Sequence, residues 1–137
     1  MSGSGRVSIA MAATTSVKED TVLEAWRDLL ERKHRAVAAL EKALRPHGLG
    51  ITEYEILERL ATAGPEQRRM QDLGEGLHLS QSALSRAVAR LEDDGLAQRG
   101  MCTEDRRGIY VCATPDGLKR FKAAKPAHRS ALADALG

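Results

Sequence analysis

Residues 80–95 read SQSALSRAVARLEDDG, and this stretch carries the pattern that decides the fold. Its apolar residues return every three or four positions, as on one side of an α-helix, at Ala83, Leu84, Ala87, Val88 and Leu91. Ser80 suits the N-cap of such a helix, and Gly95 suits its C-terminal end. The stretch therefore predicts an amphipathic helix from Ser80 to about Asp94.

The opposite side of this helix is polar. It carries short hydroxyl and amide side chains together with two arginines, namely Gln81, Ser82, Ser85, Arg86 and Arg90. A helix fits the major groove of DNA, and such side chains reach base edges and phosphates there. An arginine on a helix surface can also be a simple solvated charge, so this face alone does not decide between the two interpretations.

Two extended runs follow the helix. They cover Leu96–Cys102 and Ile109–Thr114, and turn-forming residues separate them. This order predicts a β-hairpin whose tip carries Asp105, Arg106 and Arg107. Arginines at the tip of such a hairpin are placed to enter a neighbouring minor groove.

The remaining segments predict helices on both sides of this unit. Leucines and other apolar residues spaced by three and four predict a long helix over residues 20–45, after a flexible extension over residues 1–18. Thr52, with Glu55 three residues later, predicts the capped start of a second helix, and Met70–Leu77 predicts a short third helix. Thr114 and Pro115 predict the start of a last helix over 115–136, which Pro126 is expected to kink or split.

Three helices followed by a two-stranded hairpin form the winged helix-turn-helix layout, here over about residues 50–114. The helix from Leu79 to Arg86, its continuation from Val88 to Leu96, and the hairpin motif Asp105-Arg106-Arg107-Gly108 resemble the multiple antibiotic resistance regulator (MarR) family. The hairpin exit through Thr114-Pro115-Asp116-Gly117 is similar too. The recognition helix and the wing together, at this spacing, form a specific signature.

The resemblance implies a mainly α-helical fold with a small β-hairpin wing, in a single domain over residues 19–137. It implies a cytoplasmic, homodimeric regulator of transcription that binds a pseudo-palindromic operator in double-stranded DNA. Such a regulator is often a repressor released by a small phenolic or lipophilic effector. The resemblance also implies that Asp105 braces Arg107 as that arginine enters the minor groove.

In one respect the chain departs from the family. Members usually run longer, and here only eleven residues follow Pro126. The dimer is therefore expected to use the helices over 20–45 and 115–136, with the first helix carrying more of the interface. The alternative that remains open is a winged-helix module that binds or antagonises another regulator.

Charge and residue composition limit the kinds of function that this sequence can have. The formal net charge is only +2, so DNA affinity has to come from the placement of charges and not from their number. The two cysteines and four histidines show no zinc-ligand spacing, and catalytic or phosphate-binding motifs are not recognisable. We expect no enzyme activity, no cofactor and no membrane partner.

Other residues are open to two interpretations. Trp26, His34, His47 and Tyr54 could line an effector cavity between the first two helices and the last one, or the aromatic residues could be core or dimer-interface residues with exposed histidines. Cys102 could be a redox-active thiol beside the wing arginines, although a small half-buried residue is the more ordinary interpretation.

Overall fold

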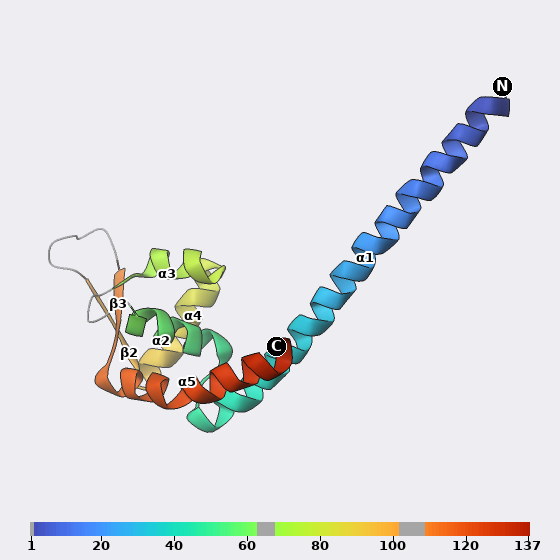
Figure 1. The fold of residues 1–137 in the computed structure, drawn as a ribbon. Helices are drawn as coiled ribbons and strands as arrows, with labels where there is room; N and C mark the ends of the chain where they lie inside the picture. The colour runs from blue at the N-terminus through green and yellow to red at the C-terminus, as the bar shows by residue number, and fades with distance from the viewer. Residues whose placement is uncertain (1, 63–67, 102–108) are drawn as a thin grey trace.

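The computed structural model describes residues 2–62, 68–101 and 109–137. A lobe of short helices and strands is joined to one long helix that projects away from it, and the C-terminus lies beside this helix (Figure 1). The expected fold class, mainly α with a small β-hairpin, is confirmed. Within the described ranges, none of the helices has the length and apolar character needed to cross a membrane.

The long helix is α1, Ser2–Leu44, followed by a 3-10 turn at Arg45–His47. It begins well before residue 20, the expected start. Residues 6–19 contain neither proline nor glycine, so no residue there interrupts the helix. The expected flexibility of residues 1–18 stays a prediction. Gly48 ends the turn in the left-handed region with φ +67°, and Leu49 N donates to Leu44 O at 3.3 Å.

Helix α2 spans Ile51–Thr62. The predicted cap at Thr52 is wrong, because Tyr54 N donates to Gly50 O at 3.0 Å and the helix already includes Ile51. Thr52 therefore lies inside the first turn. The inner face of this helix buries Tyr54, Ile56, Leu57 and Leu60. The helix-breaking sequence Ala63-Gly64-Pro65, which follows it, lies outside the described residues.

Helices α3, Met70–Leu77, and α4, Gln81–Asp93, form the helix-turn-helix pair. Between them His78 adopts a left-handed conformation with φ +55°, which is unusual for a residue with a side chain. The predicted ends of α4 are confirmed: Ser80 Oγ accepts from Ala83 N at 3.1 Å, and Gly95 has φ +72°.

Strands β2, Ala97–Met101, and β3, Ile109–Ala113, form the expected antiparallel hairpin. A third strand, β1 at Arg68–Arg69, pairs with β3, so the strand order is β1-β3-β2. This strand was not predicted, since two residues carry no alternation pattern. Met101 at the end of β2 pairs with Ile109 at the start of β3, so residues 102–108 are the connection between the two strands.

Helix α5, Pro115–Leu136, closes the lobe and packs along α1. Its predicted cap is confirmed, with Thr114 Oγ1 accepting from Gly117 N at 3.1 Å. The same threonine holds the end of α4, since Thr114 N donates to Leu96 O at 3.1 Å and Thr114 Oγ1 donates to Gly95 O at 2.7 Å. A side chain at position 117 would collide with Leu96 O, so glycine is required there. Pro126 was expected to kink or split the helix; the split does not occur, because α5 continues through Pro126 as one helix, and the kink stays a prediction.

The core lies where α2, α4 and the sheet meet under α5. Its members come from every part of the lobe, which is why the lobe behaves as one packing unit. The largest fully buried side chains are Tyr54, Leu44, Ile56, Leu57, Leu60, Leu73, Leu84, Leu91, Leu96, Val88 and Val111.

Candidate nucleic-acid interface

Helix α4 presents the polar face expected from the sequence. Its apolar side is anchored in the core through Leu84, Ala87, Val88 and Leu91. Gln81, Ser82 and Arg86 are exposed, and Ser85 is half-buried. Because one side of the helix is fixed by burial, the other side is held outward as a preformed surface of short polar groups and one arginine.

Ser80 and Ser82 are connected at the start of α4. Ser80 Oγ is the helix cap and lies 3.3 Å from Ser82 Oγ. Ser80 therefore orients Ser82 at the N-terminus of α4. At this end of a helix the unpaired backbone N–H groups favour negative charge. Phosphate or a base acceptor are the groups that such an end of a helix can hold.

Arg90 lies differently from Arg86. Its Nε is 2.6 Å from Glu53 Oε1 on α2, and the arginine side chain is 63% exposed while that of the glutamate is 13% exposed. The sequence suggested an arginine reaching toward DNA, and the structure instead shows one already paired with a carboxylate. Any DNA contact by Arg90 therefore has to compete with, or share, this ion pair.

Arg99 on β2 is a polar residue that sequence reasoning did not single out. Its Nη2 donates to the backbone oxygen of Ser85 at 3.0 Å, and its Nε lies 2.6 Å from Glu92 Oε1. Both partners belong to α4. Sequence offered one signal only: alternation along the strand puts Arg99 on the side of buried Ala97, where a charged group needs a partner.

The wing tip is the other half of the expected interface. Asp105, Arg106 and Arg107 lie outside the described residues, as does Cys102. The described strands bring the two ends of this loop together at the Met101–Ile109 pair. The roles of these residues stay predictions.

The residues proposed for an effector cavity are not brought together within one chain. Tyr54 is fully buried in the core, whereas Trp26 is 53% exposed and His34 is exposed on α1. His47 is half-buried in the turn after α1. In the single chain, Tyr54 is thus a core residue, and Trp26 belongs to an exposed helix face.

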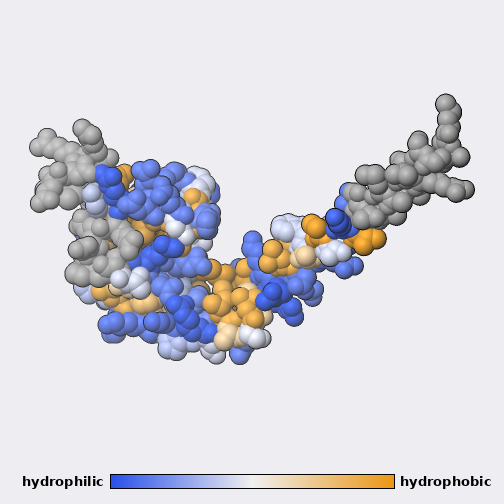
Figure 2. Space-filling view, turned by 45° about the horizontal axis from the view of Figure 1, so that its top comes forward, coloured by the Kyte–Doolittle hydropathy of each residue, from blue (hydrophilic) through white to orange (hydrophobic). Residues whose placement is uncertain are grey.

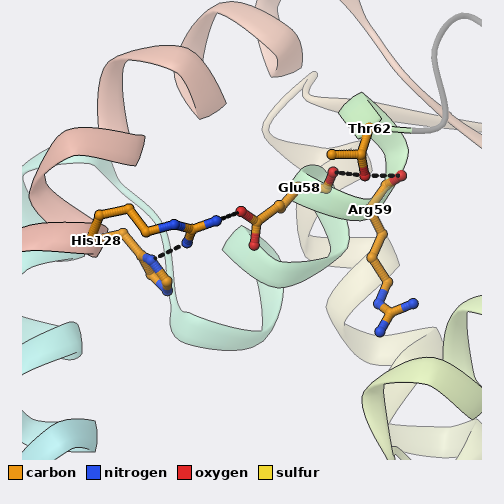
Figure 3. Close-up of polar contacts among 5 residues, drawn as sticks. Glu58, Arg59, Thr62 and His128 are labelled. Atoms are coloured by element: carbon orange, nitrogen blue, oxygen red, sulfur yellow. Dashed lines mark hydrogen bonds and ion pairs between the residues drawn. The ribbon is translucent and has the colours of Figure 1, made fainter. Parts of the chain in front are cut away.

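Tyr54 belongs instead to a cluster between α2 and α5. Its ring stacks on buried His128 at a centroid distance of 4.1 Å and contacts Phe121 at 5.6 Å. The Arg129 guanidinium lies 2.7 Å from His128 Nδ1 and also pairs with Glu58 of α2. Figure 3 shows His128 and Glu58, one on each of the two helices that this cluster joins. A guanidinium can only donate, so Nδ1 accepts and neutral His128 carries its proton on Nε2.

The cluster shifts the titration of its members. Burial lowers the pKa of His128, the neighbouring Arg129 lowers it further, and Glu58 acts in the opposite direction. Burial raises the pKa of Tyr54, and Glu58 raises it too, while Arg129 opposes the shift. Among the described residues, the Tyr54 hydroxyl is buried with no hydrogen-bond partner. The joint between α2 and α5 is therefore built around a neutral histidine.

A helix-turn-helix pair followed by a small antiparallel sheet defines the winged-helix class of proteins. Residues 47–108 match the model of the MarR family. Among solved structures, Sco3205, a MarR family transcriptional regulator from Streptomyces coelicolor in complex with DNA, is 30% identical with a TM-score of 0.78, covering 83% of this chain and 72% of that one. This chain belongs to the MarR family of transcriptional regulators.

Two further relatives extend the comparison. CouR from Rhodococcus jostii RHA1, solved bound to p-coumaroyl-CoA, is 29% identical with a TM-score of 0.70, covering 79% of this chain and 76% of that one. The uncharacterised HTH-type transcriptional regulator YkoM of Bacillus subtilis (strain 168) is 30% identical over 92 residues, or 67% of this chain. The alignment spans 58% of the length of YkoM.

Proposed function

We propose that this protein is a sequence-specific DNA-binding regulator of transcription, acting as a homodimeric repressor on a pseudo-palindromic operator. The observation that carries the proposal is the outward face of α4, where Ser82 and Arg86 are exposed on a helix whose other side is locked into the core. The DNA complex of the related Sco3205 supports the same assignment.

The homodimer is supported by α1. Within nine residues this helix exposes five large apolar side chains, Val22, Leu23, Trp26, Leu29 and Leu30, which we call the α1 stripe. They lie on the part of α1 that projects beyond the lobe, where Figure 2 shows apolar residues at the surface. Five neighbouring apolar side chains exposed on one helix mark an interaction surface. A second copy of the chain carries the same stripe and can cover it in a two-fold symmetric dimer.

An effector is the finer part of the proposal. CouR is a relative solved with an aromatic acyl ligand, and a small phenolic or lipophilic molecule is the corresponding class here. Trp26 and His34, both exposed on α1, are the residues that we assign to it. A thermal-shift screen of phenolic acids and their thioesters tests this, and Trp26→Ala is expected to remove the shift given by any ligand found.

Selection of binding sites from random double-stranded DNA tests the main proposal. The expected result is a two-fold symmetric site with half-site centres about one helical turn, roughly 10 base pairs, apart. If no DNA sequence is enriched and the protein binds other purified regulators instead, the alternative of a protein-interaction module replaces this proposal.

A further inference from the structure

Arg99 lies on the side of the hairpin that faces α4. Along β2, Ala97 is buried and Arg99 is half-buried, whereas Gln98 and Gly100 are exposed. This alternation is that of a strand with one covered face. The guanidinium of Arg99 is therefore directed at the helix and is only partly available to solvent, its side chain being 28% exposed.

The Arg99 guanidinium contacts two residues of α4. One joins Nη2 to Ser85 O at 3.0 Å and the other joins Nε to Glu92 Oε1 at 2.6 Å. Ser85 and Glu92 are seven residues apart, which is about two helical turns, so they lie on the same side of the helix. The Ser85 contact is a hydrogen bond, whereas the Glu92 contact is an ion pair, because Nε has no hydrogen-bond partner among the described residues. The planar guanidinium presents different nitrogens to the two partners, which a single lysine ammonium does not.

The position of the two contacts gives them a mechanical role. The hairpin is joined to α4 covalently through Gly95 and Leu96, at its base. Arg99 supplies a polar attachment roughly 10 Å further along the strand, three residues on. Val111, which pairs with Arg99 across the hairpin, is buried in the core and anchors β3, and Arg99 adds to this packing a polar contact between β2 and α4. A contact with α4 at this point favours one angle between the hairpin and the helix.

We propose that Arg99 is a positioning residue, which holds the wing at the angle where wing and recognition helix engage one DNA site at the same time. The inference rests on the proposed DNA-binding function and deepens it. Arg99 acts through the hairpin, and Glu92 is its partner in this role.

The test compares two duplexes carrying the site selected for the unmodified protein. One ends at the edges of the major-groove core, and the other adds A·T-rich flanks that a wing can follow. The unmodified protein binds the longer duplex more tightly, and the ratio of the two affinities measures the wing's contribution. Arg99→Gln is expected to lose about tenfold on the longer duplex and about twofold or less on the short one.

Glu92→Gln separates positioning from simple charge. Removal of an acidic group next to DNA ordinarily strengthens binding, because phosphate is repelled less. Loss of the Arg99 partner predicts the opposite for the flanked duplex, namely a reduced affinity ratio. Lys122→Gln on exposed α5 is the matched control: it removes one positive charge, as Arg99→Gln does, and it should leave the ratio unchanged.

Thermal unfolding of each variant accompanies the binding measurements, so that a loss of folded protein is not counted as a loss of wing contact. Should Arg99→Gln fail to fold, Glu92→Gln carries the test alone. Equal losses on both duplexes, or an unchanged ratio, overturn the inference while the proposed function stands. If the unmodified protein selects no DNA site at all, the proposed function fails first and the inference falls with it.

Discussion

Arg86 is the residue on which sequence readout is expected to depend most directly. It is exposed on α4 beside the capped helix start, and among the described residues no ion pair holds it, in contrast to Arg90. Arg86→Ala is expected to cost about 1–3 kcal/mol per half-site and to relax the preference at one base position. Site selection on the parent and the variant measures both quantities.

Two comparisons make the Arg86 result specific. Arg32→Ala, an equal loss of charge on exposed α1, should leave the selected sequence intact. Arg107→Ala should change the preference for A·T-rich flanks instead, because a minor-groove arginine responds to groove width and potential. Asp105→Ala should act in the same direction but less strongly. An unaltered selected sequence for Arg86→Ala would remove α4 from base recognition.

His128 links stability to pH. Its pKa in the folded protein is lowered by burial below the ordinary value of about 6.5, so the folded state binds fewer protons than the unfolded chain. The stability from neutral His128 is complete above that ordinary value and is lost as the pH falls through the lowered folded pKa. Protonation would also set a second cation against Arg129, leaving only Glu58 to offset it.

His128→Phe keeps an aromatic ring on Tyr54 and removes the titration. We expect the parent to lose more free energy of unfolding than this variant between about pH 7.5 and pH 5. Urea unfolding at the two pH values measures the difference. Equal losses in parent and variant would mean that His128 does not titrate in this range on folding.

At the scale of elements, the turn between α3 and α4 contains a strained residue. A left-handed conformation costs a residue with a side chain about 1–2 kcal/mol, and glycine avoids this at an entropic cost of about 0.5–1 kcal/mol. His78→Gly is therefore expected to stabilise the fold by about 0.5–1 kcal/mol and to raise the melting temperature by roughly 2–4 °C. Thermal unfolding checks the shift.

Gly95→Ala is the reverse substitution at a second left-handed position and serves as the control for His78→Gly. It has φ +72°, and a Cβ built there meets nothing within 4 Å, so Gly95→Ala changes conformational strain without a clash. It should destabilise the protein by about 1 kcal/mol. A drop in stability for His78→Gly would show that its side chain contributes more than its backbone strain costs.

The same scale shows what sequence could predict. Ser80, Thr114 and Gly95 were placed correctly, because a cap or a left-handed stop depends on atoms a few residues away. Thr52 was misplaced, because the carbonyl of Gly50 accepts the first hydrogen bond of the helix, which begins two residues earlier than predicted. The partners of Arg90 and Arg99 come from other elements, and only the assembled lobe brings Glu53, Ser85 and Glu92 to them.

For the whole molecule, the α1 stripe sets the assembly. Leu23→Glu together with Leu30→Glu places two charges on a face where each leucine is 43% exposed in the single chain. The pair is expected to give monomers, because burying two carboxylates against apolar partners costs several kcal/mol. Each monomer should then bind a single half-site only. Sedimentation and gel shift measure the two effects.

Thr21→Glu with Ala38→Glu is the control for that pair. Both positions are exposed on α1 and lie outside the stripe, so the added charge is the same and the dimer should persist. A monomeric parent at tens of micromolar protein would end the dimer proposal.

The junction of α4 with α5 has a consequence for how such a dimer could be tuned. Thr114 grips both Gly95 and Leu96, and Gly117 lets the backbones approach so closely that no side chain fits between them. The junction is closely packed and hydrogen-bonded, so we expect α5 and the recognition helix to rotate together as one rigid unit. In the proposed homodimer, a rotation of α5 against α1, on which it packs, is therefore expected to change the distance between the two recognition helices. Such a change would move the two helices away from the spacing of successive major grooves, about one helical turn of DNA.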